Sequence, residues 1–189
     1  MNYTPIFDTG INESDCLLWS IINHGQDKCE FFRLINEWSN IDFLFEYFDK
    51  HKKLLETDFW IRNGITSVEL AVRRVYSEIR SFKNELRELN KKGLITDSDE
   101  INKIFKNLHK NQFYVGKSTE MEQVKAKPDV HAPILRFYGL KLEKNQILIT
   151  GGGIKLTETI QEMPELEAEI KKTILVDAIL KEEKIYFLP

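Results

Sequence analysis

The 189-residue sequence contains only two cysteines, Cys16 and Cys29, and neither belongs to a CxxC pair. Two cysteines are too few for the disulfide framework of a small secreted protein, so we expect buried thiols in a reducing compartment. The four histidines are scattered and lack the spacing of metal ligands. We therefore expect neither a metal site nor a disulfide-stabilised fold.

Long apolar runs are also absent, because none approaches the roughly 18 residues typical of a membrane-spanning helix. The N-terminal residues lack the basic and apolar regions of a secretory signal. A hydrophobic content of 42%, with 11% aromatic residues, is too high for a disordered chain and suffices for a sizeable core. These features predict a folded, cytoplasmic protein.

Charge is unevenly distributed along the chain. The net charge is −3, but residues 103–155 contain ten Lys/Arg and four Asp/Glu, a local balance of +6 that leaves −9 for the remainder. The overall charge argues against a generic nucleic-acid-binding protein. A basic segment on an acidic body can still place a positive field over one surface.

Residues 1–112 are expected to form a mostly helical body with one early strand. Residues 16–22 are a short apolar run with a β-branched end, which favours a buried strand. Asp27 with Glu30 predicts a capping box at the start of the first helix. A second helix is expected over residues 40–55, from the spacing of its apolar residues.

The longest expected element is a helix from about Thr66 to Lys92. Thr66 with Glu69 predicts a capping box, and Gly93 supplies the C-terminal stop. Apolar residues alternate spacings of four and three for three heptads, so the stripe either packs inside the protein or binds a partner helix. Its members are Val68, Val72, Val75, Ile79, Phe82, Leu86 and Leu89. Charges of both signs interleave on the polar face, which is typical of a solvated surface.

Residues 113–189 are expected to form a basic, strand-rich module that is integrated with the helical body in one domain. A short helix over residues 97–108 comes before it, and residues 121–133 are interpreted as a loop. Strands over 135–142 and 146–150 are predicted to pair antiparallel through a tight turn.

Two further features complete the expected α+β fold. The glycine triplet of residues 151–153 is expected to break the second strand, as a bulge or a tight crossing does. Pro164 is expected to open a C-terminal helix, because proline is favoured at the first helical position.

Residues 134–170 resemble the end of the RelE/HigB family of toxins from type II toxin–antitoxin systems. In that family a strand carrying Leu-Arg leads by a hairpin into a strand that ends in glycine, followed by a Lys/Thr-rich stretch, a proline and a helix. Arg136, Lys155, Thr157 and Pro164 fall on the family's arginine, first paired lysine, threonine and proline. A leucine replaces the second lysine, and the N-terminal half has no counterpart in the small toxins.

The resemblance implies a bacterial mRNA endoribonuclease that inhibits translation, needs no metal or cofactor, and is neutralised by a helix-turn-helix antitoxin. Its partners would be that antitoxin and mRNA, usually on the ribosome. Such a reaction needs cations near the phosphate, a group that transfers protons, and often an aromatic ring. The expected catalytic residues are Arg136, Lys155, Tyr138 and His131. The expected RNA contacts are Lys141, Thr157 and Lys127.

Each candidate also has a structural interpretation. Arg136, Lys141 and Lys155 suit the solvated face of a half-buried sheet, and Tyr138 suits a sheet rim. His131 lies between two prolines and suits an exposed loop. The alternative function is therefore a non-catalytic protein that binds another protein through its long helix, and the sequence leaves both functions open.

Overall fold

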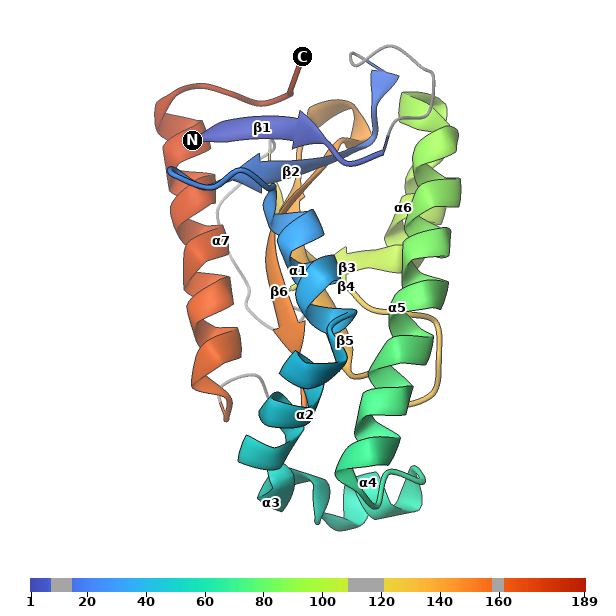
Figure 1. Cartoon of the computed structure of the whole chain (residues 1–189). Helices are drawn as coiled ribbons and strands as arrows, with labels where there is room; N and C mark the ends of the chain where they lie inside the picture. The colour runs from blue at the N-terminus through green and yellow to red at the C-terminus, as the bar shows by residue number, and fades with distance from the viewer. Residues whose placement is uncertain (8–14, 109–120, 158–161) are drawn as a thin grey trace.

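A six-stranded sheet organises the chain in the computed structural model, which describes residues 1–7, 15–108, 121–157 and 162–189 (Figure 1). The strand order is β1-β2-β6-β5-β4-β3. The strands are β1 (Asn2–Pro5), β2 (Leu18–Ile22), β3 (Phe105–Asn107), β4 (Glu122–Ala126), β5 (Leu135–Lys141) and β6 (Ile147–Ile154). Neighbours pair antiparallel except β2 and β6, which are parallel. The sheet is thus larger than the expected antiparallel module and takes strands from both halves of the chain.

Helices cover both faces of this sheet (Figure 1). The α-helices are α1 (Glu30–Trp38), α2 (Ile41–Lys50), α3 (Lys52–Leu55), α4 (Asp58–Arg62), α5 (Val68–Lys91), α6 (Ser98–Ile104) and α7 (Pro164–Glu182), and short 3-10 turns span Gly93–Ile95 and Glu143–Asn145. Helices α1 and α5 pack on one face and α7 packs on the other. The α+β class, with its long helix and C-terminal helix, is confirmed. Within the described residues no helix is long and apolar enough to cross a membrane.

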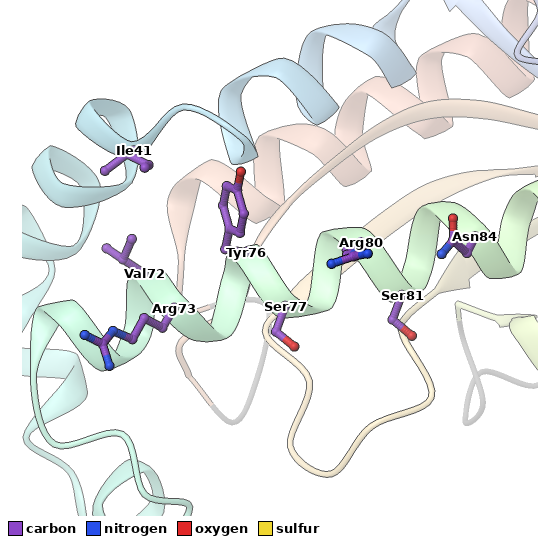
Figure 2. A pocket seen from close by; sticks show the side chains of 8 residues that line it. All are labelled: Ile41, Val72, Arg73, Tyr76, Ser77, Arg80, Ser81 and Asn84. Atoms are coloured by element: carbon purple, nitrogen blue, oxygen red, sulfur yellow. The ribbon is translucent and has the colours of Figure 1, made fainter.

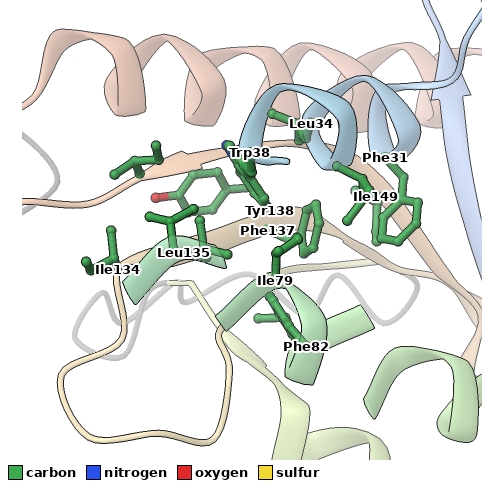
Figure 3. Packing of buried hydrophobic residues seen from close by; sticks show 14 of the residues in the cluster. Phe31, Leu34, Trp38, Ile79, Phe82, Ile134, Leu135, Phe137, Tyr138 and Ile149 are labelled. Carbon is green, nitrogen blue, oxygen red and sulfur yellow. The ribbon is translucent and has the colours of Figure 1, made fainter. Parts of the chain in front are cut away.

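Phe137 of β5 lies at the centre of the core (Figure 3). Its ring centroid is 5.2 Å from that of Phe31 and 5.0 Å from that of Trp38, both on α1, and 5.2 Å from that of Phe82 on α5. Aromatic pairs at such distances stabilise beyond their buried area. The aromatic cluster therefore packs both α1 and α5 against strand β5. On the other face, a second apolar cluster joins β5 and β6 to α7.

Helix α5 confirms the expected long helix, and its apolar stripe packs inside the protein. Val72, Val75, Ile79, Phe82 and Leu86 are all buried. The stripe is part of the main core cluster, so it is not a surface for another chain.

Both expected capping boxes are wrong. Helix α1 begins at Glu30 itself, with Cys29 at the cap position, because the Glu30 carboxylate is taken up by a buried ion pair. Helix α5 is capped by Ser67, whose hydroxyl accepts a hydrogen bond from the Leu70 N–H. A hydroxyl one residue later in the chain thus replaces Thr66 at this helix end.

Two expected helices end earlier than their apolar spacing predicts. The helix expected over 40–55 is interrupted at His51, which separates α2 from α3. The helix expected over 97–108 ends at Ile104, and the next three residues form β3, paired with β4. Pairing with a neighbouring strand overrides the local helical pattern there.

Two expected interruptions of the sheet are also wrong. Residues 121–133 contain strand β4 rather than only loop, because five of its residues pair with β5. The glycine triplet does not break β6, which continues to Ile154. Thr150 is an extra residue in the β5–β6 ladder, where Tyr138 lies opposite Gly151 and Gly139 lies opposite Ile149. Strand β6 therefore stays continuous through this bulge. Beyond the bulge, the register between β5 and β6 is shifted by one residue.

Close packing accounts for the glycines of the triplet. A Cβ on Gly153 would lie 2.5 Å from a Leu166 methyl on α7. A Cβ on Gly152 would lie 3.1 Å from a Leu34 methyl on α1, and closer still to the Arg136 carbonyl. Helices therefore contact the strand backbone directly on both faces.

Candidate functional site

The two central residues of the expected ribonuclease site lie on β5 with little access to solvent. The Tyr138 side chain is 1% exposed, and burial raises its pKa to about 12. The Arg136 guanidinium donates hydrogen bonds to the carbonyls of Pro133 at 3.0 Å and Leu135 at 2.6 Å. Burial lowers the Arg136 pKa from its ordinary value. The tyrosine is thus enclosed, and the arginine is half-buried and engaged with backbone.

Strand register places three of the polar residues on the sheet face that α7 covers. Arg136 lies opposite Gly153 and Tyr138 lies opposite Gly151, and a Cβ on either glycine would meet α7. Lys125 of β4 lies opposite Tyr138. Residues directly opposite on paired strands point to the same face, so these three side chains lie together.

The remaining expected residues lie at the ends of strands. Lys127 follows β4 and is exposed, whereas Lys155 and Thr157 follow β6 and are half-buried. The Lys155 N–H donates to the Ile134 carbonyl at 2.8 Å, which extends the β5–β6 ladder. Lys127 and Lys155 therefore flank the Arg136 end of the sheet.

Lys141 and His131 lie apart from one another. Lys141, at the other end of β5, donates from Nζ to the Asn102 side chain at 3.2 Å. His131 is exposed, and its carbonyl accepts a hydrogen bond from Arg74 on α5. The structure does not gather all seven expected residues into one site.

A groove along the outward face of α5 is the candidate site that the structure adds (Figure 2). It encloses about 680 Å³ and its walls are more apolar than polar. Its lining residues are Ile41, Val72, Arg73, Tyr76, Ser77, Arg80, Ser81 and Asn84. Ile41 and Tyr76 are about half exposed, at 52% and 53%. We call these eight residues the α5 groove.

Arginine supplies the charge of the α5 groove. Among the described residues that line it, none carries a carboxylate. Within the described residues neither Arg73 nor Arg80 has an ion-pair partner within 4 Å. Two unpaired cations beside an apolar floor form a surface for a partner that carries carboxylates and an apolar side chain.

Sequence reasoning missed this groove because it counted the acidic residues of α5 as one solvated set. Glu78 is in fact buried, and its carboxylate accepts hydrogen bonds from the N–H groups of Ile134 and Leu135. Spacing contained the signal, since Glu78 lies three residues after Val75 and four before Phe82, on the apolar stripe. Because Glu78 points into the protein, the outward face of α5 has fewer carboxylates and is more basic than the sequence suggests.

The other acidic residues of α5 lie near polar or basic neighbours. Glu85 accepts a hydrogen bond from Ser81 at 3.1 Å, and Glu88 pairs with Lys91 at 2.7 Å. Glu69 accepts a hydrogen bond from Ser67 that lowers its pKa, and the charge of Arg73 also helps to lower it. The groove therefore offers binding rather than acid–base chemistry, because no carboxylate or histidine lines it. No group of three metal-binding side chains occurs among the described residues.

No family model matches the chain, and no curated protein or solved structure matches it either. The resemblance to RelE/HigB toxins stays a prediction.

Proposed function

We propose that the protein is a non-catalytic binding protein whose α5 groove binds an acidic amphipathic helix of another protein. The observation that carries this proposal is that Arg73 and Arg80, which come before and after the exposed Tyr76 on α5, have no ion-pair partner within 4 Å in the part of the chain that the structure describes. The buried apolar stripe of α5 contributes Val72 to the edge of this surface, whereas Val75, Ile79, Phe82 and Leu86 are not among the lining residues.

Helix geometry supports a helical partner. Seven residues separate Arg73 from Arg80, which corresponds to about 10 Å along a helix with a rise of 1.5 Å per residue. Carboxylates seven residues apart on a second helix have the same separation and project from one face. A helix that lies along α5 can therefore meet both arginines at once.

Tyr76 supplies the apolar anchor between the two charges. Tyrosine and arginine are enriched among the residues that dominate binding energy, and charged pairs at a rim mainly set specificity. An apolar side chain of the partner would contact Ile41 of α2 and Tyr76 of α5, which both line the groove and are about half exposed (Figure 2).

The proposal is tested with two synthetic helical peptides and fluorescence anisotropy. One carries two glutamates seven residues apart with a leucine between them, and the other carries lysines in place of the glutamates. The acidic peptide should bind and the basic peptide should not. Arg73→Glu with Arg80→Glu should weaken binding by roughly fivefold to thirtyfold, because two rim pairs contribute on the order of 0.5–1 kcal/mol each.

A matched control changes net charge equally elsewhere. Lys28→Glu with Lys53→Glu alters two exposed lysines that do not line the groove, so it should leave acidic-peptide binding within about twofold of wild type. Equal loss in the control, or equal binding of both peptides, contradicts the proposal. Binding of single-stranded RNA in place of the acidic peptide at the same residues also contradicts it.

A ribonuclease toxin is the second proposal, and one observation favours it. Lys125, Arg136 and Tyr138 share a sheet face, with Lys127 and Lys155 at its end. If the Arg136 end of this sheet cleaves mRNA, inducing the protein alone should arrest growth, and Arg136→Ala with Lys155→Ala should relieve the arrest. Each lost cation costs about 2–4 kcal/mol of transition-state stabilisation. An unaffected culture with intact mRNA rejects this function.

A further inference from the structure

A second candidate binding site lies at the C-terminal end of strand β6, and the sheet topology identifies it. Strands β2 and β6 are parallel neighbours. The chain leaves β2 for α1 on one sheet face and leaves β6 for α7 on the other (Figure 1). Ligands of sheets with parallel strands typically bind at such a switch point, outside the carboxyl ends of the strands.

A cleft of about 280 Å³ occupies this switch point, between α1, α2 and α7. We call it the switch-point cleft. Its floor is the β6 segment from Gly152 to Ile154, and the aromatic walls are Trp38, Phe43 and Tyr47. Its volume is at the lower end of small-ligand sites.

Strand pairing shows which backbone groups of β6 face this cleft. The Lys155 N–H donates a hydrogen bond to the Ile134 carbonyl. Gly153, two residues before Lys155, lies opposite Arg136 and has the same orientation toward β5. The N–H and C=O of Gly152 and Ile154 therefore point away from β5. Two hydrogen bonds agree, because the Gly152 N–H donates to Glu169 at 3.2 Å and the Ile154 carbonyl accepts from the Tyr47 hydroxyl at 3.1 Å.

One donor and one acceptor are left at this edge. Strand β2 pairs with β6 only as far as Ser20 opposite Ile149, so it does not reach them. No described residue hydrogen-bonds to the Gly152 carbonyl oxygen or to the Ile154 N–H. Backbone groups almost always have hydrogen-bond partners, and these two lie at the cleft, so solvent or a ligand in the cleft can pair with them.

We propose that the switch-point cleft binds one residue of an extended polypeptide segment of a partner protein, in parallel register opposite Gly153. In a parallel ladder a residue donates its N–H to the carbonyl before its partner and accepts from the N–H after it. The residue would thus bond to the Gly152 carbonyl and to the Ile154 N–H. The bound residue would occupy the edge of β6 beyond the point where β2 stops pairing with it. Peptide-binding domains use the same mode, the addition of a strand to a sheet edge.

The surrounding charges favour a neutral amide over a phosphate. Arg33 lines the cleft, but its guanidinium is held by Glu30 and Glu37. Lys50 lies 3.7 Å from Glu165, and Glu169 already accepts from the floor. Carboxylates thus accompany each cation at the cleft, and an added anion would meet repulsion.

The test uses acetyl-valine-N-methylamide as a single blocked residue, titrated into 15N-labelled protein. In the free protein the Ile154 amide should exchange with solvent faster than the Gly153 amide. Added ligand should shift the Ile154 amide resonance downfield and slow its exchange. An analogue methylated on the valine nitrogen should bind at least about tenfold more weakly, because the donor for the Gly152 carbonyl is lost and the added methyl group clashes with that oxygen.

A pair of variants on one helix supplies the control. Phe43→Ala removes a wall of the cleft and should weaken ligand binding severalfold, whereas Phe45→Ala, outside the cleft, should not. Three outcomes overturn the inference: equal protection of the Ile154 and Gly153 amides, no ligand-induced shift at Ile154, or equal binding of the methylated analogue. The second outcome would mean that the edge holds water only.

Discussion

Two buried glutamates, Glu30 and Glu78, have pKa values that shift in opposite directions. Burial alone raises the pKa of Glu30, but hydrogen bonds from Arg33 and Lys172 outweigh it and hold the pKa below its ordinary value. For Glu78 burial prevails over backbone N–H groups and Arg74, so its pKa is raised. Two cations around Glu30 against one around Glu78 account for the difference.

Replacing Glu30 should expose this difference as a pH dependence of stability. Because the folded pKa is lowered, Glu30 stabilises the fold above its unfolded pKa of about 4.3 and loses this contribution as pH falls through the folded value. Glu30→Gln should lower the free energy of unfolding by about 3 kcal/mol near neutral pH, with a smaller difference in acid. Urea unfolding of the wild type and the variant, once near neutral pH and once below the unfolded pKa of about 4.3, measures this difference in the free energy of unfolding.

Glu37→Gln is the matched control, because Glu37 pairs with the same Arg33 but is 35% exposed. Its loss should cost less than about 1 kcal/mol. A Glu30→Gln variant as stable as this control would show that the buried network between α1 and α7 contributes little.

The glycine triplet allows a second prediction at the residue scale. A Cβ at Gly152 meets the backbone carbonyl of Arg136, whereas a Cβ at Gly153 meets only the end of the Leu166 side chain. Gly152→Ala should therefore destabilise by about 1–3 kcal/mol and Gly153→Ala by less. Thermal unfolding that ranks the two variants in the opposite order would contradict the packing described for β6.

Helix α5 has one face in the core and one face exposed to solvent. Its inward stripe forms core and its outward face forms the α5 groove, so substitutions on the two faces should have separate effects. Ile79→Asp should lower the free energy of unfolding by several kcal/mol, because an unpaired carboxylate enters an apolar core. Ser77→Asp, on the exposed face, should change it by about 0.5 kcal/mol or less. Similar stability of both variants would contradict the assignment of the faces.

Local pattern was sufficient for some elements and insufficient for others. The stripe of α5, strand β5 and the proline at the start of α7 carry periodicity or turn chemistry that can be recognised in sequence. Strand β4, with the residues Glu-Gln-Val-Lys-Ala, carries almost no such signal and is a strand because it pairs with β5. Strand β3 likewise depends on β4.

Both candidate sites depend on features that sequence could not supply. The switch-point cleft requires Ser20 to lie beside Ile149, a contact between segments far apart in the chain. The α5 groove requires Glu78 to face inward, which its spacing allowed but its charge obscured. The resemblance predicts Arg136 and Lys155 as catalytic residues, and the register places both at one end of the β5–β6 ladder.

At the scale of the whole molecule, one sheet joins residues from both halves of the chain. Removing either half would leave strands without neighbours, so the chain should unfold as one cooperative unit. The three tryptophans, Trp19, Trp38 and Trp60, report on the N-terminal half, while far-ultraviolet circular dichroism also includes α7. The two signals should give coincident urea transitions. Separate midpoints would indicate that the halves fold independently.

The interaction proposed for the whole molecule is tested most directly by exchanging charges across it. The variant with Arg73→Glu and Arg80→Glu should lose the acidic helical peptide and gain the lysine peptide, since opposite charges are restored with reversed sign. Wild type should show the reverse preference by at least about tenfold. If the variant binds neither peptide while remaining folded, or keeps the preference of wild type, the α5 groove does not recognise an acidic helix.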